Sequence, residues 1–168
     1  MLVIYWTVFR YSNWEFIIAA TEKGLCFTGS ENQGVDELRA WVNKAFKGME
    51  LIEDKEKLAP YAKQFQQYFD CQRGEIDFPL DFKGTDFQMS VWAALRAIPY
   101  GTTYSYSDIA ERLNNPKSVR AVGTAIGSNP VMIVIPCHRV IGKNGTLTGF
   151  RAGLDMKKRL LELEGIKL

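Results

Sequence analysis

Residues 105–128 read SYSDIAERLNNPKSVRAVGTAIGS, and this stretch decides the fold of the second half of the chain. Ser105 suits the N-cap position of a helix and Asp108 follows three residues later, so we expect a helix over 106–113. Asn114-Asn-Pro then favours a turn, and residues 118–128 form a second predicted helix. Two short helices around a tight turn indicate a helix-turn-helix.

The second of these helices is unusually rich in small residues, including Gly123. A glycine inside a helix costs about 0.5–1 kcal/mol relative to alanine, so its presence needs a reason. One explanation is close packing of another helix of the same protein. The other is close approach of this backbone to a nucleic-acid groove, and the composition of the helix leaves both open.

Two more helices are predicted in the second half of the chain. The first ends at Pro99-Tyr-Gly and the last covers 154–164. The apolar face of the first is formed by Phe87, Val91, Trp92 and Leu95. We therefore expect residues 83–168 to fold as a mostly helical lobe.

The first half of the chain has a different pattern. Its first 30 residues alternate apolar and polar positions, with turns at Ser12-Asn13 and Lys23-Gly24, which predicts a small antiparallel sheet. Apolar residues at helical spacing predict helices over 35–46 and 61–69. Together these elements form an N-terminal lobe over residues 1–82.

The predicted fold is therefore α+β, with the lobe boundary in the extended, turn-rich segment 78–84. The N-terminal lobe carries a short antiparallel sheet and helices. The C-terminal lobe carries the helix-turn-helix and is expected to be winged-helix-like. We expect the N-terminal lobe to support the C-terminal one structurally.

Composition and charge restrict the class of protein. Hydrophobic residues make up 46% of the 168 residues, which is enough for a core, and no apolar run approaches the roughly 20 residues of a membrane helix. The first residues, MLVIYWT, lack the features of a signal peptide, so a cytoplasmic protein without membrane contact is expected. Residues 83–168 contain 12 Lys and Arg against 6 Asp and Glu, a net charge of +6, which favours a polyanionic partner.

The cysteines and the single histidine limit the chemistry. Cys26, Cys71 and Cys137 are an odd number without CxxC spacing, so neither a disulfide framework nor a zinc cluster is expected. A metal site using His138 would need ligands from distant segments. We predict reduced thiols, no metal and no cofactor.

The run VMIVIP at 131–136 predicts a buried strand. Cys137, His138 and Arg139, the candidate reactive residues, follow it and are expected to lie on a turn. A thiol is a strong nucleophile only as thiolate, and a neighbouring base or cation produces that form. Because successive side chains of an extended segment point to opposite sides, His138 need not touch the Cys137 sulfur, and a bridging water could join them. The alternative is that Cys137 is a small core residue.

At this point the sequence resembles a known family. Residues 135–140, IPCHRV, are similar to the active-site signature of the O6-alkylguanine-DNA alkyltransferases, or methylated-DNA–protein-cysteine methyltransferases. Further motifs stand in the family's order: FQMSVW at 87–92, IPYGTTYSY at 98–106, Ala110, NPKSVRAVG at 115–123, SNP at 128–130 and LEG at 163–165. The resemblance covers most of residues 84–165, whereas the N-terminal lobe matches only in its general pattern of strands and helices.

The resemblance implies a stoichiometric DNA repair reaction. Glu164 would orient His138, and His138 would act through a water to deprotonate Cys137. The thiolate would then displace guanine from the alkyl carbon of O6-alkylguanine in double-stranded DNA, with O4-alkylthymine as a candidate second substrate. The product is a thioether that the chain cannot hydrolyse, so one monomer removes one lesion. Glu164 could instead be a solvated charge near the C-terminus.

The resemblance also implies residues that hold the base. Tyr106 would reach guanine N3, a backbone N–H at Arg151 would bind the leaving oxygen, and backbone carbonyls of Cys137 and Val140 would accept from the guanine amino group. Phe150 stands where many members have tyrosine, so it would offer an aromatic face without a hydroxyl.

Other residues would serve DNA entry and the active-site turn. The base would be flipped out through the minor groove, with Arg120 filling the vacated stack and the small Ala121 and Gly123 allowing close approach. Arg139 is also expected among the DNA-contacting residues. Asn129, grouped with the catalytic residues, would satisfy the backbone of the turn before Cys137.

Two other classes of function stay open at this level. A DNA-binding protein that signals lesions without repairing them would use the same helix-turn-helix. A Cys-His hydrolase would use His138 as a direct base on Cys137, but would leave the basic helix-turn-helix without a purpose.

Overall fold

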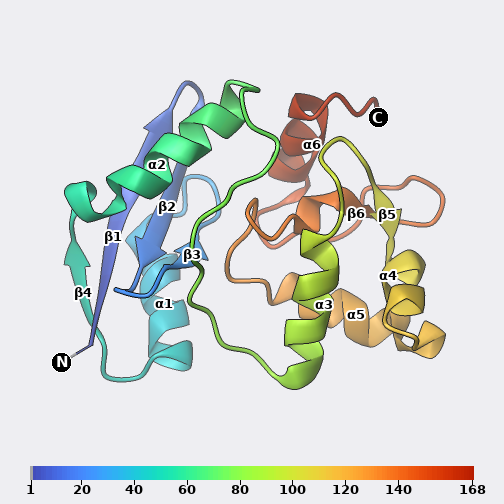
Figure 1. The fold of residues 1–168 in the computed structure, drawn as a ribbon, viewed down its shortest axis with the longest axis horizontal. Coiled ribbons are helices and arrows are strands. Elements are labelled where there is room, and N and C mark those ends of the chain that lie inside the picture. The colour runs from blue at the N-terminus through green and yellow to red at the C-terminus, as the bar shows by residue number, and fades with distance from the viewer. Residues whose placement is uncertain (1) are drawn as a thin grey trace. The chain divides into compact units, whose positions relative to one another are not determined.

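The computed structural model describes residues 2–168, and the chain divides into two compact units with the boundary between Lys83 and Gly84. Among the described residues, the first unit contains a four-stranded sheet and two α-helices, and the second contains four α-helices and a two-stranded sheet. Figure 1 shows the arrangement of these elements. The predicted α+β fold is confirmed. Within the described residues, no helix has both the length and the apolar character needed to cross a membrane.

The sheet of the first unit has four strands in the order β3-β2-β1-β4. β1 (Val3–Tyr11) and β2 (Trp14–Ala20) form a hairpin, and β3 (Leu25–Thr28) pairs antiparallel with β2. β4 (Glu50–Glu53) pairs parallel with β1 at the edge. The antiparallel sheet predicted for the first 30 residues is confirmed, but the prediction missed β4, a short edge strand with glutamate at both ends that makes the sheet mixed.

Both faces of this sheet are covered, as the burial of successive residues along β2 and β3 shows. On one face, α1 (Val35–Ala45) packs its Leu38 and Val42 into a buried cluster with Ile4 and Ile17. On the other face, Phe9 and Phe16 contact two aromatic side chains of α2, and the nearest pairs of ring centroids lie 5.6 Å apart. The first unit is thus a three-layer arrangement with its own core.

Helix α2 (Lys55–Phe69) begins six residues before the predicted start at residue 61. The Asp54 side chain accepts a hydrogen bond from the Lys57 N–H at 3.0 Å and caps this earlier start. Pro60 lies inside the helix, where it lacks the N–H that an ordinary residue would donate. The cap and the packing of the following turns outweigh that single missing bond.

The second unit contains the helix-turn-helix. α4 (Tyr106–Arg112) is followed by a 3₁₀ turn, η1 (Pro116–Ser118), and by α5 (Val119–Gly127). The predicted N-cap of α4 is confirmed, because Ser105 Oγ accepts from the Asp108 N–H at 3.0 Å and Asp108 Oδ2 accepts from the Ser105 N–H at 2.8 Å.

The remaining helices complete the core of the second unit. α3 (Asp86–Arg96) packs on α5, and its Trp92 Nε1–H donates to the Ala125 carbonyl at 2.9 Å. α6 (Leu154–Leu163) is the last helix of the described residues. Both lie close to their predicted positions, because apolar spacing over ten or more residues is a strong signal.

A short parallel pair of strands was missed by the sequence analysis. β5 (Tyr104–Ser105) pairs with β6 (Val140–Ile141), and Tyr104 lies opposite Val140. Strands of two residues show no periodicity, so nothing in the sequence indicated them. Their pairing places the start of α4, and therefore Tyr106, beside the segment that follows Cys137.

Candidate active site and nucleic-acid interface

The segment before Cys137 is a turn, not the strand that the sequence predicted. The Ile135 N–H donates to the Val131 carbonyl at 3.0 Å, which closes the chain on itself. Ile133 has φ 77°, in the left-handed region that β-branched residues avoid. Such a conformation costs on the order of 1–3 kcal/mol and persists only where the surroundings hold it.

Asn129 holds this turn from inside. Its Nδ2 donates to the Ile135 carbonyl at 2.8 Å and its Oδ1 accepts from the Val131 N–H at 2.9 Å, with 1% of the residue exposed. Next along the chain, Pro136 has φ −79° and ψ 62°, and the Cys137 N–H donates to Ile135 at 2.7 Å, which is an inverse γ-turn. The 3₁₀ turn η2 (Cys137–Arg139) follows, so side-chain and backbone bonds together fix the position of the cysteine.

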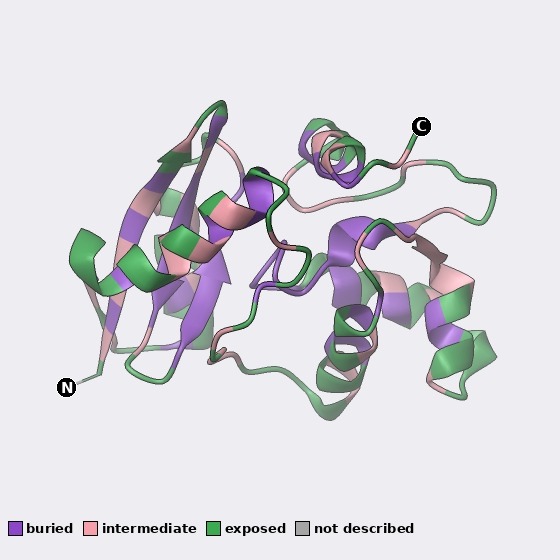
Figure 2. Cartoon of the chain, turned by 45° about the horizontal axis from the view of Figure 1, so that its top comes forward, coloured by how far each residue is buried: buried purple, intermediate pink, exposed green. Residues whose placement is uncertain are grey.

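Cys137 lies in a buried stretch, residues 129–140, all of which are buried (Figure 2). Burial raises the pKa of the Cys137 thiol. A hydrogen bond with Asn129 and the positive charges of Arg151 and Lys157 oppose that rise. The thiol is therefore protonated at neutral pH, and the surrounding cations stabilise the thiolate once a base removes its proton.

The candidate base is His138, the next residue along the chain, which is fully buried. Its Nε2 lies 2.6 Å from Glu164 Oε2. Burial lowers the pKa of His138, and Glu164 opposes this shift. The ring is then neutral, and because the carboxylate only accepts, we assign the proton to Nε2. Nδ1 is the nitrogen that can accept a proton, which is the tautomer a general base requires.

Glu164 is the centre of a buried polar network. Its carboxylate accepts from His138, from Arg139 Nε at 2.8 Å and Nη2 at 3.0 Å, and from the Gly101 N–H at 3.0 Å. Its side chain is fully buried, so the alternative of a solvated charge is wrong. The residue caps the C-terminal end of α6, which fixes where the carboxylate lies.

Arg139 is part of this network, and the expected contact of its side chain with DNA is not supported. Its guanidinium is buried, forms the two bonds to Glu164 and donates from Nη1 to the Ile98 carbonyl at 2.8 Å. Three of its N–H groups are thereby used inside the protein. The contact with DNA was expected only from the resemblance to the family, and a motif in the sequence does not show which way a side chain points.

We expect the free energy of unfolding to decrease as the pH falls from 6.5 to 5. The folded-state pKa of His138 lies below its ordinary value of 6.5, so the unfolded chain takes up the proton first as the pH falls. His138 is the only histidine, so other side chains contribute little in this range. Urea unfolding at several pH values measures the effect, and His138→Gln is the control in which the slope should flatten. An equal slope in both proteins would contradict the assignment.

The residues expected to hold a base lie on separate elements of the second unit. Tyr106, at the start of α4, is partly buried, and Val140 is fully buried in β6. Phe150 and Arg151 lie in the loop between β6 and α6 and are partly exposed. Arg151 is close enough to act electrostatically on Cys137.

Lys157 belongs to this site and was missed by the sequence analysis. It is fully buried, and its Nζ donates to the Thr148 carbonyl at 2.8 Å. Burial lowers its pKa to about 8, and the nearby Cys137 opposes that shift. A lysine of an amphipathic helix is normally exposed, so the only signal available was its place on the same helix as apolar core residues.

The exposed face of α5 has the character of a nucleic-acid interface. Arg120 and Ala121 are exposed on it. A Cβ added at Gly123 would meet nothing closer than the Tyr106 ring at 3.9 Å, an ordinary contact, and one at Gly127 would meet nothing within 4 Å. Packing inside the unit does not require these glycines, so close helix packing does not explain them. The alternative, close approach of an outside partner, is taken up in the proposed function.

No group of three or more Cys, His, Asp or Glu side chains is arranged to hold a metal ion among residues 2–168.

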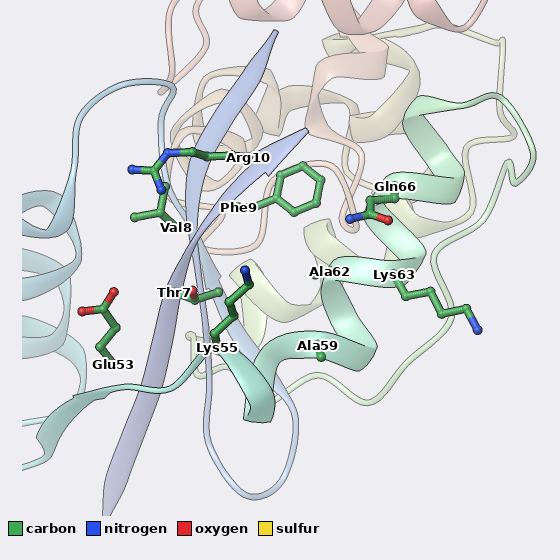
Figure 3. Close-up of a pocket in the computed structure, with 10 residues that line it drawn as sticks. All are labelled: Thr7, Val8, Phe9, Arg10, Glu53, Lys55, Ala59, Ala62, Lys63 and Gln66. Carbon is green, nitrogen blue, oxygen red and sulfur yellow. The ribbon is translucent and has the colours of Figure 1, made fainter. Parts of the chain in front are cut away.

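A cavity of about 480 Å³ lies in the first unit between β1 and α2 (Figure 3). Its lining combines charged and polar side chains, among them Arg10, Glu53 and Lys55, with small and apolar ones, and includes neither cysteine nor histidine. The reactive groups are therefore those around Cys137.

Comparisons with known proteins match both units. Residues 4–82 match the family described as 6-O-methylguanine DNA methyltransferase, ribonuclease-like domain, and residues 86–166 match its DNA binding domain. The inducible methylated-DNA–protein-cysteine methyltransferase of Bacillus subtilis is 53% identical over 161 residues, which is 96% of this chain and 90% of that protein. The chain belongs to the 6-O-methylguanine DNA methyltransferase family.

Other members support this placement across the whole chain. The methylated-DNA–protein-cysteine methyltransferase of Methanosarcina acetivorans is 39% identical, covering 96% of this chain and 99% of that protein. The crystal structure of Mycobacterium tuberculosis OGT in complex with DNA is similar with a TM-score of 0.82 and 35% identity, covering 95% of this chain and 92% of that one. Every residue of the site lies in the second unit, within or next to the family's DNA binding domain.

Proposed function

We propose that this protein repairs DNA by transferring an alkyl group from O6 of guanine in duplex DNA to Cys137, irreversibly and once per molecule. The observation that carries the proposal is the buried His138–Glu164 hydrogen bond of 2.6 Å, made by the residue that follows the buried Cys137 in the chain, together with the positive charges of Arg151 and Lys157 near that thiol. Membership of a family whose relatives are named methylated-DNA–protein-cysteine methyltransferases supports it. Because one thiol accepts one alkyl group and all the proposed site residues lie on one chain, we propose that the protein acts as a monomer. We further propose that it acts in the cytoplasm.

The reaction begins with removal of the Cys137 proton. Neutral His138 accepts it on Nδ1 through a bridging water, and Glu164 stabilises the resulting imidazolium through Nε2. The thiolate attacks the alkyl carbon, an S–C bond forms, and the C–O6 bond breaks with its electron pair leaving on guanine. The thioether has no leaving group that water could displace, so the protein is consumed.

The leaving guanine carries developing negative charge, which donors in the pocket stabilise. In this proposal the Tyr106 hydroxyl donates to N3 of the base, and the backbone N–H of Arg151 donates to O6. The carbonyls of Cys137 and Val140 accept from the amino group, which selects guanine. Phe150 offers an aromatic face to the base without a polar contact.

To reach the thiol, the damaged nucleotide must leave the stack, at a cost of a few kcal/mol. The small residues on the exposed face of α5 suit the narrow minor groove, and Arg120 on that face would occupy the vacated space. The excess of positive charge in residues 83–168 supplies the sequence-independent attraction to phosphates.

Arg120→Ala is expected to slow alkyl transfer from a duplex by about 10- to 100-fold while changing affinity for undamaged duplex by less than about threefold. The reason is that the side chain stabilises the flipped state, whereas many cations share the phosphate contacts. Single-turnover kinetics and fluorescence anisotropy measure the two effects. Arg96→Ala removes the same charge from the exposed end of α3 and should leave transfer unchanged. Equal losses in both variants would contradict the role of Arg120.

The proposal itself is tested by intact-protein mass spectrometry after mixing with an equimolar duplex that carries one O6-methylguanine. We expect a gain of one methylene unit, located on Cys137 by peptide mapping, with the base restored to guanine. An unchanged mass with the DNA still bound would replace the proposal with a lesion-binding protein that does not repair. Release of methanol or of another small product over many turnovers would favour a hydrolase.

A further inference from the structure

Thr148 lies at a junction of three hydrogen bonds that join different elements of the second unit. Its Oγ1–H donates to the Tyr106 phenol oxygen at 3.1 Å. The Tyr106 O–H donates to the Thr148 carbonyl at 3.4 Å, and Lys157 Nζ donates to that same carbonyl at 2.8 Å. The loop between β6 and α6 is thus tied at one residue to the first turn of α4 and to a buried lysine of α6.

The lengths of these hydrogen bonds would allow the Tyr106 O–H to leave the Thr148 carbonyl and donate to a bound guanine instead. The Tyr106 O–H makes the longest of the three bonds, so it is the bond that costs least to break. The Thr148 carbonyl keeps Lys157 as a donor when the phenol turns away, and no buried acceptor is left without a partner. The bond that the phenol oxygen accepts from Thr148 also makes its own O–H a stronger donor, because linked hydrogen bonds polarise one another.

We propose that Thr148 is a positioning residue for Tyr106, whose hydroxyl holds and polarises the phenol so that the phenol O–H can donate to the departing guanine. This inference rests on the proposed function, because it assigns Thr148 a task only if Tyr106 contacts the base. Thr148 does not touch the reacting atoms. It acts on the reaction through the geometry and donor strength of the phenol.

Thr148 is a better test position than its partner Lys157. Lys157 is buried and lies near Cys137, so replacing it would alter both the fold and the thiol. Thr148 is exposed, and valine keeps its branched shape while removing only the hydroxyl. Serine keeps the hydroxyl and removes a methyl group. Thr146, in the same loop and also exposed, is the matched control for loss of a threonine hydroxyl.

The experiment measures single-turnover transfer from a saturating duplex that carries O6-methylguanine, in the full-length protein. We expect Thr148→Val to slow transfer about 5- to 10-fold, Thr148→Ser to restore it to within about twofold, and Thr146→Val to have no effect. We expect Tyr106→Phe to slow transfer by at least as much. Adding Thr148→Val to Tyr106→Phe should then cause no further loss, because Thr148 acts through the phenol oxygen.

The outcomes separate this inference from the function on which it rests. A Thr148→Val effect that is the same size in the Tyr106→Phe background would show that Thr148 acts independently and would overturn the inference alone. Normal transfer by Thr148→Val or by Tyr106→Phe would do the same, with methylation of Cys137 still standing. Absence of any mass gain in the unaltered protein would overturn the proposed function and the inference together.

Discussion

Replacing Cys137 with alanine is expected to abolish alkyl transfer completely while leaving affinity for a duplex with O6-methylguanine within about threefold of the original. The thiol forms the only new bond to the alkyl carbon in the proposed reaction, and the substitution leaves no thiol in the site. DNA affinity depends mainly on cations and on α5, which this change does not touch. The two readouts are intact mass and a gel-shift or anisotropy titration.

The other cysteines make this prediction a sharp one. Cys71 is the exposed cysteine, whereas Cys26 and Cys137 are buried. If transfer followed accessibility, Cys71 would take the alkyl group. Burial raises the pKa of Cys26 far above its ordinary value, and no histidine accompanies it. Cys71→Ala and Cys26→Ala should therefore transfer normally, and a methylated Cys71 in the Cys137→Ala protein would contradict the mechanism.

The start of α4 illustrates what the sequence alone could predict. Its capping box is formed by Ser105 and Asp108, which are three positions apart in the sequence. These two residues therefore predict the start of the helix without information from elsewhere in the chain. The same holds for α3, α5 and α6, whose apolar spacing is local. The sheet of the first unit was predicted less well, because the pairing of β4 with β1 joins residues more than 40 positions apart.

The active-site turn could not be predicted from local pattern. The run of β-branched residues before Cys137 favours a strand, and Ile133 in a left-handed conformation contradicts local propensity. What overrides propensity is the Asn129 side chain, which takes the place of strand partners at Val131 and Ile135. Only the resemblance to a family pointed to Asn129 beforehand, and it did so through a motif and not through a physical signal.

Buried charged side chains were the other feature of the site that the sequence could not predict. Lys157 has no sequence feature that separates it from the exposed Lys158 beside it. Arg139 looked like a residue for DNA and lies instead against Glu164. The partners of Arg139 come from distant segments, at Glu164 and Ile98, whereas Lys157 bonds to the Thr148 carbonyl in the irregular loop before α6, and a single sequence shows neither arrangement. The chemistry of Cys137 was therefore foreseeable, but the charges that tune it were not.

Glu164→Gln is expected to reduce both stability and transfer by large amounts. Glutamine has nearly the shape of glutamate but only one oxygen, whereas His138, Arg139 and the Gly101 N–H all donate to this position. The amide nitrogen would face one of these donors, and the Arg139 charge would be left buried without a counter-charge. Removing one partner of a buried ion pair typically costs about 3–5 kcal/mol, so the urea midpoint should fall strongly. Transfer should fall up to about 100-fold, because the base loses the group that orients it.

Glu162→Gln is the matched control, since it makes the same substitution two residues earlier in α6. Glu162 is exposed and pairs with Lys158 at 3.8 Å, a surface contact worth at most about 1 kcal/mol. Its replacement should leave transfer unchanged and stability nearly so. If Glu164→Gln lowered stability but left the transfer rate of the folded fraction intact, His138 would not need its carboxylate partner and Glu164 would be structural only. If neither quantity changed, the buried network around Glu164 would not hold the site together at all.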